Sequence, residues 1–233
     1  MLCILAIVLV FLSTSPANAG AWMREKGSGY SSTTLSATLL QDFSESTYLE
    51  YGVSDRLTLG AESNFYAFAN GVQSGTAMIF LRRPIGRRDR PSVWAYELGI
   101  GAAWSGDIVR PNFRAGISWG RGYQLGRLSG WMTVDASLFI DTYYYYEDHA
   151  YKIYAEQIVK IDSTIGLNFN DRIAGMVQVF HAAAPDTRAT SIAPSLVFKP
   201  LKNRPENRLQ LGVETQLGNS DNSAFKISFW RDL

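Results

Sequence analysis

The sequence has one cysteine, two histidines and one long hydrophobic run, and these low counts limit the classes of protein to which it can belong. Its one cysteine, Cys3, lies in the first apolar run, so the rest of the chain can form no disulfide and no thiolate metal site. The net charge of +1 argues against a nucleic-acid-binding protein, whose surface would be strongly basic. We therefore expect no nucleic acid, no metal and no cofactor among its partners.

The one long apolar run, Leu2 to Leu12, has the length of the hydrophobic region of a secretory signal. It is too short for a membrane-spanning helix, which needs about 20 residues. The small-residue ending Ala17-Asn18-Ala19 resembles a cleavage site. We predict a signal peptide over residues 1–19 and one further domain over residues 20–233.

In the rest of the chain, apolar and polar residues alternate over many stretches. Around Ser54-Asp55, two stretches place apolar and polar residues on opposite faces in steps of two, as Leu57, Leu59 and Phe65 do against Thr58 and Glu62. Period-two alternation indicates strands with two different environments, and the short polar gap indicates a tight hairpin. Long strands with an aliphatic and aromatic face and a polar face that contains glycine and carboxylates are typical of a transmembrane β-barrel.

The same pattern recurs to the end of the chain in segments of about ten residues, the length that crosses a bilayer at a tilt. We predict an all-β, antiparallel, up-and-down transmembrane barrel of about 12 strands with short loops. The strands are expected near residues 30–40, 46–53, 57–68, 75–83, 93–104, 113–119, 132–140, 151–169, 172–183, 190–199, 208–217 and 224–233. If both termini are periplasmic, the turns after the second, fourth, sixth, eighth and tenth strands are periplasmic too.

Charged residues cannot face lipid cheaply, so strand parity predicts that they line the lumen. The predicted lumen and selectivity set is Glu50, Glu62, Glu97, Arg114, Asp135, Glu156, Lys160, Asp162, Glu214 and Lys226. One interpretation is a polar conduit; the other is an ion-pair network that fills a narrow barrel. Inward glycines favour a conduit, although they could equally serve barrel curvature. These glycines are Gly52, Gly60, Gly99, Gly101, Gly116, Gly166 and Gly212.

Three other features invite a function. The first is a run of arginines beside and between Pro84 and Pro91, in a predicted periplasmic turn. These arginines would either contact phospholipid head groups or an anion, or be solvated. Tyrosines 143–146 suggest an interfacial girdle, and His149 beside two acids makes a poor metal site. The arginines are Arg82, Arg83, Arg87, Arg88 and Arg90.

His181 supports the one enzymatic alternative. With Asp186 and Ser191 nearby in the sequence, it would fit an outer-membrane lipid hydrolase in which a base activates a serine. The His-x-Ser spacing of such enzymes is absent, because Ala182-Ala183 follow. We therefore expect no enzymatic activity and no catalytic residues. A structural barrel with a blocked lumen is the third alternative.

Three segments carry a family resemblance: Ala21-Trp22, Gly27-x-Gly29-Tyr30, and EYGVSDRLTLG from Glu50 to Gly60. They resemble uncharacterised outer-membrane barrels of Proteobacteria, similar in turn to the transporter-like phenol-degradation (MetA-pathway) outer-membrane family. The resemblance implies a barrel in the outer membrane of a Gram-negative bacterium. We predict a narrow passive channel whose partners are the lipid bilayer, small solutes and, during insertion, the barrel-assembly machinery.

Overall fold

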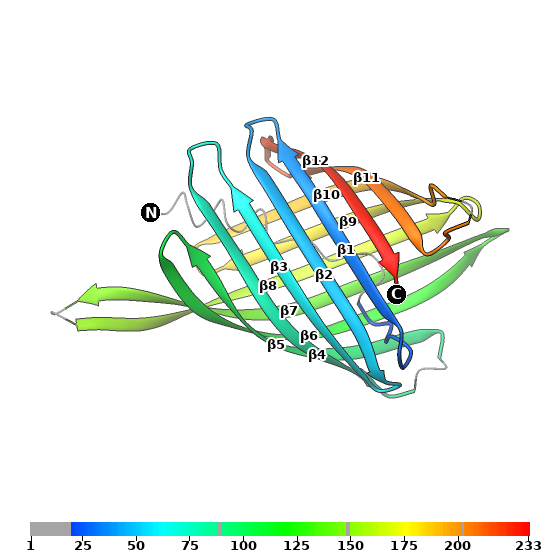
Figure 1. The fold of residues 1–233 in the computed structure, drawn as a ribbon, viewed down its shortest axis with the longest axis horizontal. Helices are drawn as coiled ribbons and strands as arrows, with labels where there is room; N and C mark the ends of the chain where they lie inside the picture. The colour runs from blue at the N-terminus through cyan, green and yellow to red at the C-terminus, as the bar shows by residue number, and fades with distance from the viewer. Residues whose placement is uncertain (1–19, 88–89, 148–149, 202) are drawn as a thin grey trace.

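The computed structural model describes residues 20–87, 90–147, 150–201 and 203–233, and these residues form twelve strands in one closed barrel (Figure 1). Each strand pairs antiparallel with its neighbours in the sequence, and the first pairs with the last. The predicted all-β up-and-down barrel is therefore confirmed. The strands are β1 Gly29–Thr38, β2 Phe43–Ser54, β3 Leu57–Ala67, β4 Gln73–Ile85, β5 Ser92–Ser105, β6 Ile108–Leu125, β7 Leu128–Glu147, β8 Ala150–Asn168, β9 Ile173–Ala184, β10 Thr187–Phe198, β11 Asn207–Gln216 and β12 Asn219–Asp232.

The outward side of the barrel is an apolar belt. On β5, Leu98 and Ile100 are exposed by 50% and 57%, whereas the alternate residues Glu97 and Gly99 are buried. Trp94 lies at one end of this face, where its ring centroid is 6.5 Å from that of Trp119 on β6. An aliphatic band edged by aromatic rings is the surface that lipid requires. Within the described residues, no helix is long and apolar enough to cross a membrane.

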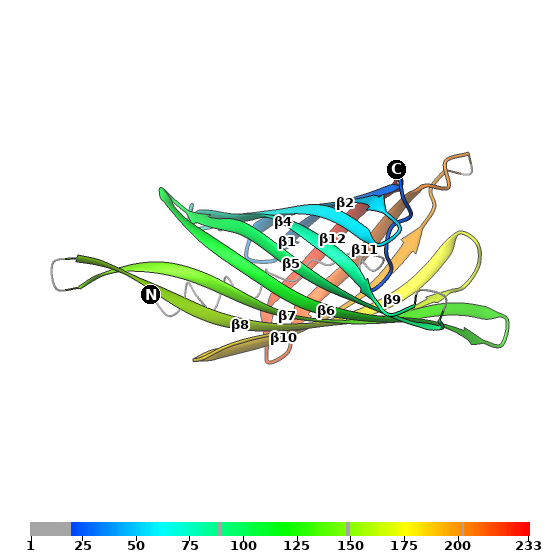
Figure 2. The same cartoon turned by 90° about the horizontal axis from the view of Figure 1, so that it is seen from below.

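Closure of the barrel brings the two ends of the domain together. The amide of Gly29 donates to the carbonyl of Leu233 at 2.8 Å, and the amide of Leu233 donates back to Gly29 at 2.8 Å. We call this side of the barrel the terminal end. The turns β2–β3, β4–β5, β6–β7, β8–β9 and β10–β11 lie at the same end, while the β7–β8 hairpin projects from the other (Figures 1 and 2).

Strand β4 contains the predicted strand over 75–83 and extends two residues beyond it, so it divides the arginine run that was predicted to lie in the turn. It runs to Ile85, so Arg82 and Arg83 belong to the strand and not to the turn. Pro84 does not end it but lies opposite Ala95 in the β4–β5 ladder, and the turn begins at Gly86, whose φ is +75°. A proline lacks only its own N–H, so a strand can continue through it where that donor is not needed.

Candidate functional site in the barrel lumen

Residues 20–28 precede β1, and we call them the lumen segment. Residues 20–24 fold into the lumen of the barrel, whereas residues 25–27 are exposed. Ala21 is only 2% exposed. The backbone amide of Arg24 donates to the hydroxyl of Thr58 on β3 at 3.3 Å. The ring of Trp22 covers Gly120 on β6, where a Cβ would lie 2.7 Å from it. At Gly20, a Cβ would lie 2.7 Å from the carboxylate of Asp135 on β7. The segment therefore crosses the lumen from β2–β3 to β6–β7.

Gly52 on β2 fixes where the segment enters. Its amide donates to the carbonyl of Ser28 at 2.9 Å, and its carbonyl accepts from the amide of Gly27 at 2.8 Å. A Cβ at position 52 would lie 2.1 Å from the carbonyl oxygen of Glu25, which is closer than any side chain tolerates. Only glycine admits the segment at this point.

An alternating row of three arginines and three glutamates connects the lumen segment to β6; we call it the arginine–glutamate chain. Its members are Arg24, Glu50, Arg82, Glu97, Arg114 and Glu62. Each arginine inside the row uses two nitrogens on two different carboxylates, and Glu50 and Glu97 each use both oxygens. The three positive and three negative charges cancel, which makes their burial tolerable.

The contacts of the chain are short and largely shielded from water. Nε of Arg24 is 2.7 Å from Oε2 of Glu50, and Arg82 binds the other oxygen of Glu50. Arg82 reaches Glu97 at 2.6 Å, and Arg114 reaches Glu97 and Glu62 at 2.6 Å each. The hydroxyl of Tyr48 donates to Glu50 at 2.6 Å and accepts from Arg82 at 3.0 Å. Charge-assisted hydrogen bonds of this kind hold side chains rigidly in place.

Large aromatic side chains fill the lumen beside this chain. Tyr48 and Phe80 stack with centroids 5.5 Å apart, and Tyr48 meets Tyr30 edge to face. The guanidinium groups of Arg82 and Arg114 each lie 5.3 Å from the centre of the Phe80 ring. The buried cluster consists of Tyr30, Tyr48, Phe80, Ala174, Met176, Val197 and Trp230, with Trp131 packed against it. The hydrophobic core of this protein thus lies in its lumen.

Strand alternation places all ten predicted lumen residues on the inward side, but in separate groups. Glu50, Glu62, Glu97 and Arg114 belong to the arginine–glutamate chain. Lys226 of β12 pairs with Glu214 of β11 at 2.7 Å. Lys160, Asp162 and Asp135 come from β7 and β8, and the Lys160 ammonium lies 4.2 Å from the centre of the Phe139 ring. Glu156 lies further along β8, opposite Asp141 in the ladder.

Sequence reasoning missed two members of the arginine–glutamate chain. Arg24 had no strand pattern to place it, and Arg82 was assigned to the arginine run of the turn. At two of the inward glycines, aromatic rings occupy the space that a side chain would fill. A Cβ at Gly60 would lie 2.1 Å from Phe80, and one at Gly166 would lie 2.2 Å from Trp131. The signal in the sequence was the position of Phe80 on its strand, because strand alternation places its ring on the inward face.

Away from the terminal end, the lumen wall of β1–β4 is polar but uncharged. Ser46 donates to Asn64 at 2.7 Å, and Asn64 donates to Thr76 at 2.9 Å. Thr34 and Ser228 are 2.8 Å apart across the β1–β12 seam. On β1–β4 the lumen wall therefore passes from hydroxyl and amide groups to a region of paired charges and aromatic rings.

The features considered for an enzyme do not form a site. His181 faces outward, and its Nδ1 lies 2.9 Å from the hydroxyl of Thr190. Ser191 has the opposite parity and is 3% exposed inside the barrel, so His181 and Ser191 do not approach one another as a catalytic pair. No group of three potential metal ligands occurs among the described residues. His149 and Arg88 lie outside those residues. Tyr143 stacks on Tyr154 with centroids 5.6 Å apart.

No protein-family model matches the chain, and a search of curated proteins gave no match. Solved structures do match it. An outer membrane channel from Pseudomonas putida F1 is 12% identical, with a TM-score of 0.57 over 95% of this chain and 100% of that one. The KdgM porin is 8% identical, with a TM-score of 0.55 over 87% and 98%. LpxR from Salmonella typhimurium is 6% identical, with a TM-score of 0.56 over 87% and 99%.

At identities this low, the TM-scores show a shared fold. Together with the apolar belt and the closed barrel of twelve strands in the described residues, this similarity identifies the protein as an outer-membrane β-barrel that shares the fold of porins and channels. The link to the phenol-degradation family stays a prediction.

Proposed function

We propose that the barrel is a narrow passive channel for small polar solutes, with the arginine–glutamate chain and the lumen segment forming its constriction. The observation that carries the proposal is the arrangement of the lumen wall on β1–β4: uncharged polar groups lead to a region where opposite charges are balanced. A solute that enters along hydroxyl and amide groups would meet fixed charges of both signs. This favours small neutral or zwitterionic solutes over strongly charged ones.

Unmatched polar atoms also support a hydrated lumen. Among the described residues, the indole nitrogens of Trp131 and Trp230 and the side-chain oxygen of Asn112 have no hydrogen-bonding partner in the protein. Buried polar groups are normally satisfied, and water is the usual partner where protein supplies none. The fold similarity to porins and to an outer membrane channel agrees with this proposal, while the similarity to LpxR is one of fold.

Single-channel recording of the refolded protein in a planar bilayer tests the proposal. We expect small, discrete conductance steps with weak selectivity between anions and cations, because the charges of the constriction cancel. A correctly folded barrel that gives no steps would contradict the channel and favour a blocked lumen.

A matched pair of variants links any current to the constriction. Glu62→Gln leaves Arg114 with excess positive charge, so we expect the anion preference to rise on the order of fivefold, which corresponds to about 1 kcal/mol of Coulomb energy at 4 Å in water. Glu45→Gln makes the same change of net charge on the outward face of β2 and should leave selectivity unchanged. Equal shifts in both variants would exclude Glu62 from the solute path.

A further inference from the structure

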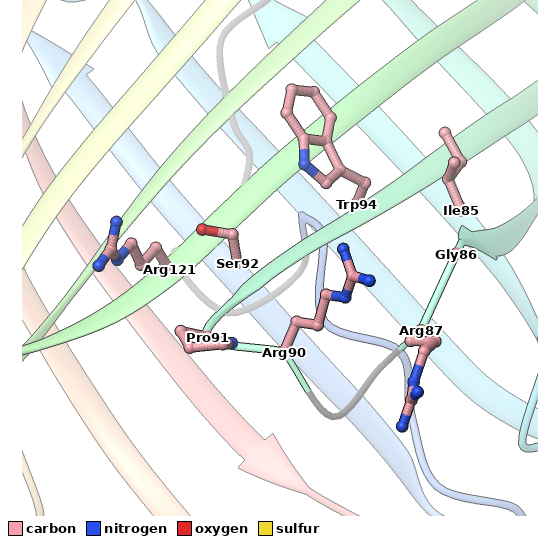
Figure 3. A pocket seen from close by; sticks show the side chains of 8 residues that line it. All are labelled: Ile85, Gly86, Arg87, Arg90, Pro91, Ser92, Trp94 and Arg121. Carbon is pink, nitrogen blue, oxygen red and sulfur yellow. The ribbon is translucent and has the colours of Figure 1, made fainter.

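A hollow of about 440 Å³ lies at the terminal end of the barrel, on its outer surface; we call it the rim pocket. It is lined by Ile85, Gly86, Arg87, Arg90, Pro91, Ser92, Trp94 and Arg121. Figure 3 shows the guanidinium of Arg90 on the side of Trp94 and Ile85, whereas Arg87 extends away from them. Arg121 lies directly opposite Ser92 in the β5–β6 ladder, and its outward parity is the same as that of Trp119.

The position of the pocket relative to the membrane follows from its own residues. Trp94 is 45% exposed on the outward face and lies beside Trp119. Tryptophan pairs of this kind mark the level of the lipid head groups. The arginines lie on the turn side of this pair and the aliphatic belt on its other side. A molecule that fills the pocket would therefore place an anionic group against arginine and an apolar part against Trp94 and Ile85.

We propose that the rim pocket is a binding site for a phosphate group, supplied by an anionic phospholipid of the membrane leaflet at the terminal end. Arg90 would bind the phosphate oxygens beside Trp94, and the Ser92 hydroxyl would donate a further hydrogen bond. Arg121, whose guanidinium lies on the far side of Ser92 in Figure 3, would add positive charge on that side. The tryptophan ring would pack against the glycerol and the upper acyl chain. Phosphatidylglycerol fits this arrangement because its head group carries net negative charge. The proposal does not depend on channel activity.

Native mass spectrometry of the full protein in mixed micelles tests the site. With phosphatidylglycerol and phosphatidylcholine present in equal amounts, we expect the protein to retain phosphatidylglycerol preferentially. The double variant Arg90→Gln/Arg121→Gln should reduce this preference by about thirtyfold, since each arginine near a membrane surface contributes about 1 kcal/mol and about 1.4 kcal/mol corresponds to a factor of ten. The control Arg127→Gln/Arg172→Gln removes the same charge from two other exposed turns of this end and should keep it.

Two further experiments distinguish a specific lipid site from non-specific electrostatic attraction and from a site for free phosphate. Trp94→Ala leaves the charge unchanged and should still weaken retention, which a purely electrostatic surface would not show. Millimolar inorganic phosphate should not displace the lipid; displacement would assign the site to free phosphate and overturn the lipid assignment. Equal loss in the two double variants, or no lipid preference in the unmodified protein, would overturn the site itself.

Discussion

Arg82 and Arg83 are neighbours in the sequence but lie in different environments, because successive side chains of a strand point to opposite faces. Arg82 is 5% exposed and binds Glu50, Glu97 and Tyr48, whereas Arg83 faces outward and is exposed. The same residue type thus holds the arginine–glutamate chain together at one position and faces outward at the next.

This pair gives a test of what the arginine–glutamate chain contributes to stability. Arg82→Gln leaves excess negative charge on buried glutamates, so we expect it to lower the free energy of unfolding by about 3 kcal/mol. Arg83→Gln should cost less than about 0.5 kcal/mol. Urea unfolding in lipid vesicles measures both. A similar small loss in the two variants would mean that solvent, and not Arg82, neutralises the glutamates.

At the scale of an element, the lumen segment is held by backbone contacts with β2 that a single methyl group would break. Gly52→Ala would force its Cβ into the Glu25 carbonyl, so we expect the segment to leave the lumen and the single-channel conductance to rise. Gly122→Ala is the control, because the nearest atom to its Cβ is 3.9 Å away, an ordinary contact.

An unchanged conductance in a folded Gly52→Ala barrel would show that the segment does not restrict the path. A rise in both variants would instead point to a general loosening of the wall. The proposal that the segment belongs to the constriction predicts a rise in Gly52→Ala alone.

At the scale of the whole molecule, the hydrophobic core occupies the space that the proposed solute path would need, so we expect stability and permeability to be opposed. Trp230 is 2% exposed and packs in the lumen cluster. We expect Trp230→Ala to lower the free energy of unfolding by about 3–5 kcal/mol and, at the same time, to raise conductance.

The neighbouring residue provides the control for this prediction. Phe229 faces outward, so Phe229→Ala should leave conductance unchanged whatever it does to stability. Urea unfolding and planar-bilayer recording of the same preparations give both quantities. A loss of stability in Trp230→Ala without a change of conductance would separate the core from the path.

The fold was predictable because lipid requires most outward side chains to be apolar, while most charged side chains of the strands lie inward. Leu98, Ile100 and Glu97 follow this pattern, and the alternation alone predicts the strands and the inward position of the charges. The partners of those charges were not predictable. Arg24 lies in a segment without alternation, and its pairing with Glu50 depends on a backbone path through the lumen that no local pattern encodes. Phe80 over Gly60 likewise depends on the register between β3 and β4.

Because cysteine is scarce, chemical labelling of a cysteine introduced into the lumen segment can report the movement of that segment. From Gly20 onward the sequence contains no thiol, so Ala21→Cys would carry the one reactive sulfur of that part of the chain. Buried against the barrel wall, this sulfur should react with a bulky, water-soluble maleimide only while the segment is out of the lumen. The labelling rate would then report how often the passage is clear, without any current being measured.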